Sequence, residues 1–147
     1  MATTVAVPAD RLSIALAIVR VMLGIVFVAH GAQKLFVFGL AGVSGGFAQM
    51  GVPLPGVTGP LVALVEFFGG IALIIGLLTR LAAFGLAIDM LGAIVLVHLK
   101  GGFFMPTGFE FALTLMAACA AVAIAGPGAF AVDNEIAKRR VGRARLA

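Results

Sequence analysis

The sequence predicts an all-α protein, namely an integral membrane four-helix bundle built from two antiparallel hairpins. Hydrophobic residues make up 63% of the 147 residues and charged residues only 11%. A soluble domain of this size hides only about 70% of the surface of its unfolded chain, so it would leave large apolar patches in water. In addition, four apolar stretches each approach the roughly 20 residues that cross a bilayer as a helix. We expect one transmembrane domain over residues 1–147 with the lipid bilayer as its surroundings.

The first predicted span covers residues 14–36 and follows Ser13, a good N-cap residue. It is the least apolar of the four spans because polar side chains interrupt it. These are Arg20, His30, Gln33 and Lys34. The residues before it are nearly uncharged and no A-x-A cleavage site follows, so we expect the segment to stay as a membrane helix rather than to be removed as a signal peptide.

A connector is predicted over residues 37–56, because this stretch is rich in glycine and has two prolines near its end. Within it, residues 44–50 are mildly amphipathic and predict a short helix at the membrane interface. The second span covers residues 57–78 and the third residues 81–99. Only two residues separate them, so they form an antiparallel hairpin with Arg80 at the turn.

The fourth span is predicted over residues 107–125. It begins at a Thr107-Gly-Phe-Glu110 sequence that matches a capping box, and Gly126-Pro-Gly128 ends it. A polar, basic tail follows over residues 133–147. Its five basic residues are Lys138, Arg139, Arg140, Arg143 and Arg145.

The basic residues also predict the orientation. Arg11, Arg80 and the tail fall on one side of the membrane, whereas Lys34 and Lys100 fall on the other, so both termini are expected in the cytoplasm. The net charge of +4 does not indicate nucleic acid as a partner, because half of the basic residues lie in the tail and no basic helix face recurs elsewhere.

Metal and haem chemistry find little support. Cys119 is the only cysteine, which excludes an internal disulfide and multi-cysteine metal sites, and no H-x-x-H or E-x-x-H spacing occurs. His30 and His98 could be imagined as axial haem ligands, but His98 lies nine residues after Asp89 and hence on the opposite helix face. No metal is expected and haem is disfavoured, while His98 stays a minor candidate.

Three ionisable residues predict a buried polar network inside the membrane. At about 1.5 Å rise per residue, Arg20 and Asp89 lie at similar depths and Glu66 lies near the middle of its span. Each charge needs a partner there, so a bridge from Arg20 to Asp89 or Glu66 is expected. Such a pair either fixes the register of the helices or belongs to a ligand site, and both interpretations stay open.

A second polar group consists of His30, Gln33 and Lys34, whose spacing of three and four residues places them on one helix face. Lys34 can extend to the headgroups or serve a site, and His30 can pack between helices or bind a ligand. Small residues at positions 17, 24 and 31 predict close packing of the first helix against a neighbour.

Several short motifs together resemble the DoxX family over about residues 11–133. They are AHGAQKLF at 29–36, GVPLP at 51–55, VEFFGG at 65–70, GLLTRLA at 76–82, Met90 with His98, and GPG at 126–128. The resemblance implies a small four-helix protein of a bacterial or archaeal plasma membrane. It also implies quinone-linked redox chemistry, with soluble redox proteins as partners.

The family motifs fall on specific residues here. The HGxxK motif matches His30, Gly31 and Lys34, and the ExxGG motif matches Glu66, Gly69 and Gly70, so these residues and Gln33 are the candidates for binding a quinone. A quinone needs an apolar slot and one or two hydrogen-bonding partners, which His30 and Glu66 could supply, with the glycines allowing a flat ring to approach the backbone.

Three functions follow as alternatives. The chain could be a quinone-interacting or membrane-anchoring subunit of a redox complex, a scaffold for soluble partners, or a small transporter or channel that acts as an oligomer. No redox centre or known catalytic motif is present, so a complete enzyme is not expected from this chain alone, and we expect it to assemble as a homo-oligomer or complex subunit.

Overall fold

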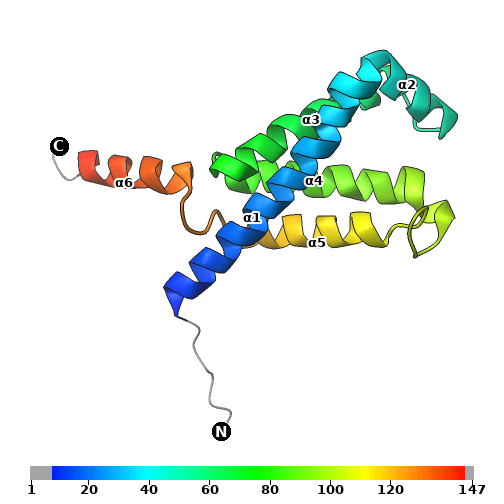
Figure 1. The fold of residues 1–147 in the computed structure, drawn as a ribbon. Helices are drawn as coiled ribbons and strands as arrows, with labels where there is room; N and C mark the ends of the chain where they lie inside the picture. Colours follow the sequence, from blue (N-terminus) through cyan, green and yellow to red (C-terminus); the bar gives the residue numbers. More distant parts are fainter. Residues whose placement is uncertain (1–7, 145–147) are drawn as a thin grey trace, which may run out of the picture.

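The computed structural model describes residues 8–144, and the regular structure in that range is helical (Figure 1). The α-helices of the described range follow one another along the chain. They are α1 (Ala9–Ala32), α2 (Gly39–Gln49), α3 (Pro55–Ile75), α4 (Thr79–Ala93), α5 (Glu110–Ala125) and α6 (Val132–Ala144). Two π-helical segments, Gln33–Phe38 and Ile94–His98, continue α1 and α4.

The helices form two crossing pairs. α4 and α5 lie side by side, α3 lies along α1, and the α1/α3 pair crosses the α4/α5 pair obliquely (Figure 1). α2 folds back at one end of the bundle, which we call the loop end. α6 extends away at the other end, which we call the basic end because Arg20 and Arg80 lie there.

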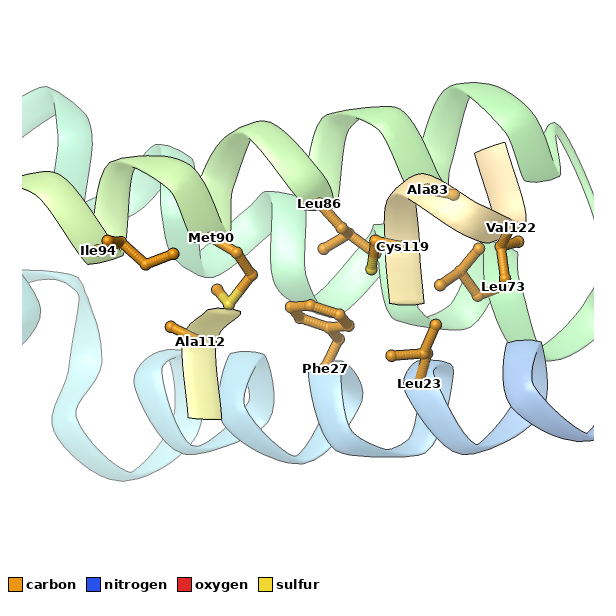
Figure 2. Close-up of a cluster of buried hydrophobic side chains, with 10 residues drawn as sticks. All are labelled: Leu23, Phe27, Leu73, Ala83, Leu86, Met90, Ile94, Ala112, Cys119 and Val122. Atoms are coloured by element: carbon orange, nitrogen blue, oxygen red, sulfur yellow. The ribbon is translucent and has the colours of Figure 1, made fainter. Parts of the chain in front are cut away.

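The core lies where the two pairs cross. Leu23 and Phe27 of α1 point towards Leu86 of α4 and Cys119 of α5, and Met90 and then Ile94 continue the cluster along α4 towards the loop end (Figure 2). Many large apolar side chains on the outer faces of the same helices are exposed. The helices are thus apolar both in the core and on their outer faces, which is expected of helices that lie in lipid.

Within the described residues, three helices are long and apolar enough to cross a membrane: the continuous α1–α2 stretch Ala9–Gln49, α3, and α4 with its extension to Gly101. They cover the first three predicted spans. α5 is shorter, and it begins at Glu110 instead of Thr107 because the predicted capping box does not form. The Glu110 carboxylate accepts a hydrogen bond from the backbone N–H of Met105 in the preceding loop.

The connector predicted over residues 37–56 contains more helix than expected. The short helix predicted over residues 44–50 is present, but it begins earlier, as α2 over Gly39–Gln49, and it packs on α3 with its buried Val43 close to Gly59. Packing there outweighs the low helix propensity of glycine. The tail is also helical, as α6, up to Ala144; Arg145 and residues 1–7 lie outside the described part of the chain.

The closest helix contact joins α1 to α3 through glycines. A Cβ on Gly70 would lie 2.7 Å from the backbone nitrogen of Val28 and 2.8 Å from the carbonyl oxygen of Gly24, and a Cβ on Gly24 would lie 2.7 Å from the carbonyl oxygen of Gly70. Gly31 likewise faces the backbone of Phe67. Gly24 and Gly31 of the predicted small-residue stripe thus form the surface on which α3 packs, whereas Ala17 lies against Gly128 in the segment after α5.

We expect Gly70→Ala to destabilise the protein by about 2–3 kcal/mol, because two backbones must move apart to admit one methyl group. Gly85→Ala in α4 is the matched control, since a Cβ there would meet no atom within 4 Å. It should raise stability slightly through better helix propensity. Denaturant unfolding of both variants in detergent measures the difference; equal stabilities would show that the α1–α3 contact is looser than described.

Candidate functional site

A charged cluster lies inside the bundle, towards its loop end. The Lys34 ammonium, on the π-helical segment after α1, lies 2.5 Å from Oε2 of Glu66 on α3, and the two side chains are 18% and 5% exposed. The charged groups that act on Asp89 of α4 are Glu66 and Lys34. Three elements of the bundle therefore bring one cation and two carboxyl groups together.

One oxygen of the Asp89 carboxyl group lacks a hydrogen bond. Its Oδ2 atom is buried and has no hydrogen-bond partner among the described residues. One ammonium group can balance one carboxylate, so the cluster is electrically neutral only when it also holds one proton. A buried polar atom without a partner in lipid is energetically costly, and such groups mark functional sites. The cluster can therefore hold and release one proton.

The predicted face of His30, Gln33 and Lys34 is divided in the structure. Lys34 turns into the bundle, where it pairs with Glu66; of the two alternatives for Lys34, the structure has the contact inside the bundle and not the one with headgroups. Gln33 and His30 are exposed on the outer surface. The π-helical segment begins at Gln33, and its wider turn changes the direction of the side chains that follow.

His30 does not share the Glu66 site that the sequence predicts. Its Nδ1 atom lies 2.9 Å from the carbonyl oxygen of Val26, and its ring lies 6.1 Å from that of Phe111 on α5. A carbonyl can only accept, so Nδ1 carries the hydrogen, and Nε2 of the neutral ring is a free acceptor. The side chain thus faces α5 and the surface, whereas Glu66 faces Lys34.

Gly69 and Gly70 pack against other helices and leave no space for a flat ring, contrary to the prediction. A Cβ on Gly69 would lie 3.2 Å from the side chain of Leu86 on α4, and Gly70 faces the backbone of α1. Both faces of α3 at this level are already covered. In this fold the ExxGG motif places Glu66 in the cluster and lets two neighbours approach α3.

The prediction that Arg20 pairs with Asp89 or Glu66 is wrong. The Arg20 side chain is buried at the basic end, where Nη1 donates to the carbonyl oxygen of Leu73 at 2.7 Å and of Ile74 at 3.2 Å. Nη2 donates to the carbonyl oxygens of Ala129 and Phe130. The last carbonyls of a helix lack partners within that helix, and the guanidinium group satisfies those of α3.

Two further residues complete the basic end: Asp133, which the sequence analysis did not single out, and Arg80, which it placed at the turn. Asp133, at the start of α6, accepts hydrogen bonds from the backbone N–H groups of Leu78 and Thr79 at 2.8 and 2.9 Å and so caps α4. Arg80 donates to the carbonyl oxygens at the end of α5, including that of Ile124 at 2.7 Å. The signal for Asp133 is weak, because an aspartate is a common cap but its helix lies over 50 residues earlier.

Asp133 makes the stability of this end depend on pH. Burial alone raises the pKa of its carboxyl, but the hydrogen bonds from Thr79 and Leu78 and the charge of Arg20 hold the pKa below its ordinary value of 3.8. A depressed folded-state pKa stabilises the protein above the unfolded-state pKa, and this contribution is lost as the pH falls through the folded-state value.

We therefore expect Asp133→Asn to lower the melting temperature near neutral pH, because one charged acceptor is lost. The difference from the unchanged protein should shrink as the pH falls from about 5 to about 2, since Asp133 becomes protonated only as the pH passes through its lowered folded-state pKa. Melting curves of both proteins in detergent across this range test it. A difference that stays constant with pH would show that the charge of Asp133 plays no part.

His98 lies apart from the charged cluster. It is half-buried, and its Nδ1 atom lies 3.4 Å from the carbonyl oxygen of Thr107 in the loop before α5. The π-helical segment that ends at His98 carries it beyond the part of α4 that holds Asp89. Its contact with Thr107 joins the end of the α4 extension to the loop before α5.

Comparison with known proteins gives consistent matches. A family model described as DoxX matches residues 15–99. An uncharacterized membrane protein of Mycobacterium tuberculosis is 34% identical over 82% of this chain and 80% of its own. The inner membrane protein YqjF of Escherichia coli is 34% identical over 83% of this chain and 92% of its own.

A third relative carries a chemical description. It is named "Putative oxidoreductase CatD", comes from Bacillus subtilis, and is 34% identical over 67% of this chain and 70% of its own. No solved structure matches the fold. The matched family segment extends from α1 to the end of the π-helical segment after α4, so it includes the three elements of the charged cluster.

Proposed function

The chain belongs to the DoxX family of cell-membrane proteins, and on this basis we propose that it is a quinone-interacting subunit of a redox-linked membrane complex. The single observation that carries the proposal is the buried Oδ2 atom of Asp89, unpartnered among the described residues, beside the Lys34–Glu66 ion pair. A site of this kind offers a proton in an apolar environment, which a quinone needs when it is reduced.

A quinone takes up two electrons and two protons to become a quinol. A soluble oxidoreductase bound to the complex supplies the two electrons. Asp89 gives its proton to the quinone, takes up a second proton from water and gives that one up in turn, while the Lys34 ammonium stays paired with Glu66. The oxidoreductase in the printed name of the Bacillus subtilis relative supports this class of chemistry.

The proposal includes the placement in the membrane. We propose that α1, α3, α4 and α5 each cross the bilayer and that the basic end is cytoplasmic. Arg80, Lys138 and Arg139 lie at that end, which is the distribution typical of cytoplasmic flanks. At about 1.5 Å per residue the 16 residues of α5 extend about 24 Å, and a bilayer core of about 30 Å accommodates such a short span by thinning locally.

A second function, anchoring a soluble partner, has an observation of its own. α6 extends away from the bundle at the basic end (Figure 1), and most of its described side chains are exposed. Its first turn is acidic, with Asp133 and Glu135, and Lys138 and Arg139 follow. A charged helix that projects from a membrane domain is a suitable contact for an oxidoreductase in the cytoplasm.

Binding of a water-soluble quinone that lacks a long chain tests the function. We expect calorimetric titration of the purified protein in detergent to give saturable binding, and Asp89→Asn to weaken it at least about tenfold, or 1.4 kcal/mol. Glu135→Gln, on exposed α6, is the control and should bind unchanged. Absence of binding to the unchanged protein, or normal binding by a folded Asp89→Asn variant, would leave the anchoring function as the better supported one.

A further inference from the structure

An open cavity of about 510 Å³ lies at the basic end, where the chain leaves the bundle and enters α6 (Figure 1). One wall consists of residues 129–132, which are apolar. The other wall consists of three polar side chains from the first turns of α6, namely Asn134, Glu135 and Lys138. Asn134 and Glu135 each lie about one turn before Lys138, so the three share one face of the helix. The cavity thus has an apolar wall and a charged wall.

Hydrogen bonds across the basic end fix the level of the cavity. Arg20 donates to the carbonyl oxygen of Leu73, near the end of α3, and also to that of Phe130 in the apolar wall. Asp133 caps the first turn of α4. The cavity therefore lies level with the ends of α3 and α4, two helices that are long and apolar enough to cross a membrane. In a bilayer that they span, this level is the headgroup layer beside the hydrocarbon core.

Phe130 provides most of the apolar surface that the cavity presents to its surroundings. Its side chain is 86% exposed, and its backbone is left-handed with a φ of +55°, which residues other than glycine rarely adopt. The hydrogen bond from buried Arg20 to its carbonyl oxygen holds this backbone in place. An exposed aromatic ring gains free energy when apolar chains cover it, and lipid provides such chains at this level.

The charged wall offers both signs of charge. Nζ of Lys138 lies 2.7 Å from Oε1 of Glu135, and an ammonium group has further hydrogens to donate to an anion. The hydrogen bond from Lys138, with the charges of Lys138 and Arg139, holds the pKa of Glu135 below its ordinary value of 4.5, so Glu135 is ionised at neutral pH. Nδ2 of Asn134 donates to the carbonyl oxygen of Gly128, and its Oδ1 accepts no hydrogen bond from the described residues. The wall thus has a donor for an anion and two acceptors for a cation.

We propose that this cavity binds the headgroup of a phospholipid with a primary ammonium group, such as phosphatidylethanolamine, from the leaflet at the basic end. The lipid phosphate binds the ammonium group of Lys138, and the lipid ammonium group donates to Glu135 and to Oδ1 of Asn134. The acyl chains begin beside Phe130. Each charge of the headgroup then meets a charge of opposite sign. The inference requires that α3 and α4 cross the bilayer, and it is independent of the proposed quinone chemistry.

Short-chain phospholipids with the same acyl chains and different headgroups test the site. Phosphatidylcholine carries the same charges as phosphatidylethanolamine, but its quaternary nitrogen has no hydrogen to donate. We expect native mass spectrometry of the protein in detergent to show that the first phosphatidylethanolamine binds at least about threefold more tightly than phosphatidylcholine, as for one exposed ion pair. Glu135→Gln should abolish this preference. Asp10→Asn is the matched control, because this exposed carboxylate of α1 does not line the cavity.

The same titrations contain the results that would overturn the site. Equal binding of the two lipids by the unchanged protein, or a preference that persists in Glu135→Gln, contradicts the proposed headgroup contacts. Tighter binding of phosphatidylglycerol, which has no ammonium group, would show that the basic residues only attract negative charge. Glycerophosphoethanolamine, the headgroup without acyl chains, should not displace the lipid at equal concentration. If it does, the ligand is a soluble phosphate ester and the lipid site is wrong.

Discussion

Replacing Arg20 with alanine is expected to lower the free energy of unfolding by at least about 3 kcal/mol. The guanidinium group is 1% exposed and donates to four carbonyl oxygens, which belong to the end of α3 and to the segment after α5. Hydrogen bonds from a charged group contribute about 1.5–3 kcal/mol each, and removing the guanidinium group leaves the buried carbonyl of Leu73 without this donor. Denaturant unfolding in detergent measures the loss.

Two companion variants show what Arg20 binds. Arg20→Lys should recover only part of the loss, since a single ammonium group cannot reach four carbonyls in the planar geometry of guanidinium. Adding Glu66→Gln or Asp89→Asn to Arg20→Ala should recover nothing, because neither carboxyl is a partner of Arg20. If either double variant recovers stability, Arg20 pairs with that carboxyl group, as the sequence alone predicts, and the hydrogen bonds described here for Arg20 are wrong.

Replacing Lys34 with methionine is expected to destabilise the protein by about 3–5 kcal/mol, the usual effect of breaking a buried ion pair. Methionine keeps the length and apolar stem of lysine but leaves the Glu66 carboxylate, 5% exposed, without its partner and next to Asp89. The double variant Lys34→Met with Glu66→Gln should recover most of the stability, because it leaves no unpaired charge in the pair.

The chain offers its own control for Lys34. Lys138 and Glu135 on α6 form an ion pair of similar length, 2.7 Å, but both side chains are exposed. Lys138→Met should therefore have no measurable effect on unfolding, because water and salt screen an exposed pair. If Lys34→Met also leaves the free energy of unfolding unchanged, or if adding Glu66→Gln does not restore it, the Lys34–Glu66 pair does not stabilise the bundle.

The sequence predicted which ionisable residues matter inside the bundle, but not which of them pair. His30, Lys34, Glu66 and Asp89 stand out because an ionisable residue in an apolar stretch needs a partner. Their pairing could not be read from depth, because two residues at one level can still face different neighbours. Arg20 lies near the end of α3, where carbonyls without partners compete for it, whereas the π-helical turn after α1 directs Lys34 towards Glu66.

What the sequence by itself determined is the class of the protein and the place of its helices. Apolar stretches of membrane length dictate helices, because lipid offers no partner to a free backbone, and the small residues of α1 indicate a close contact. The tertiary structure alone decided that Gly70 is the partner of Gly24, that Asp133 caps α4, and that the helix of the connector begins as early as Gly39. Each of these depends on which segments, distant in sequence, lie side by side, and the periodicity of a single helix contains no information about its neighbour.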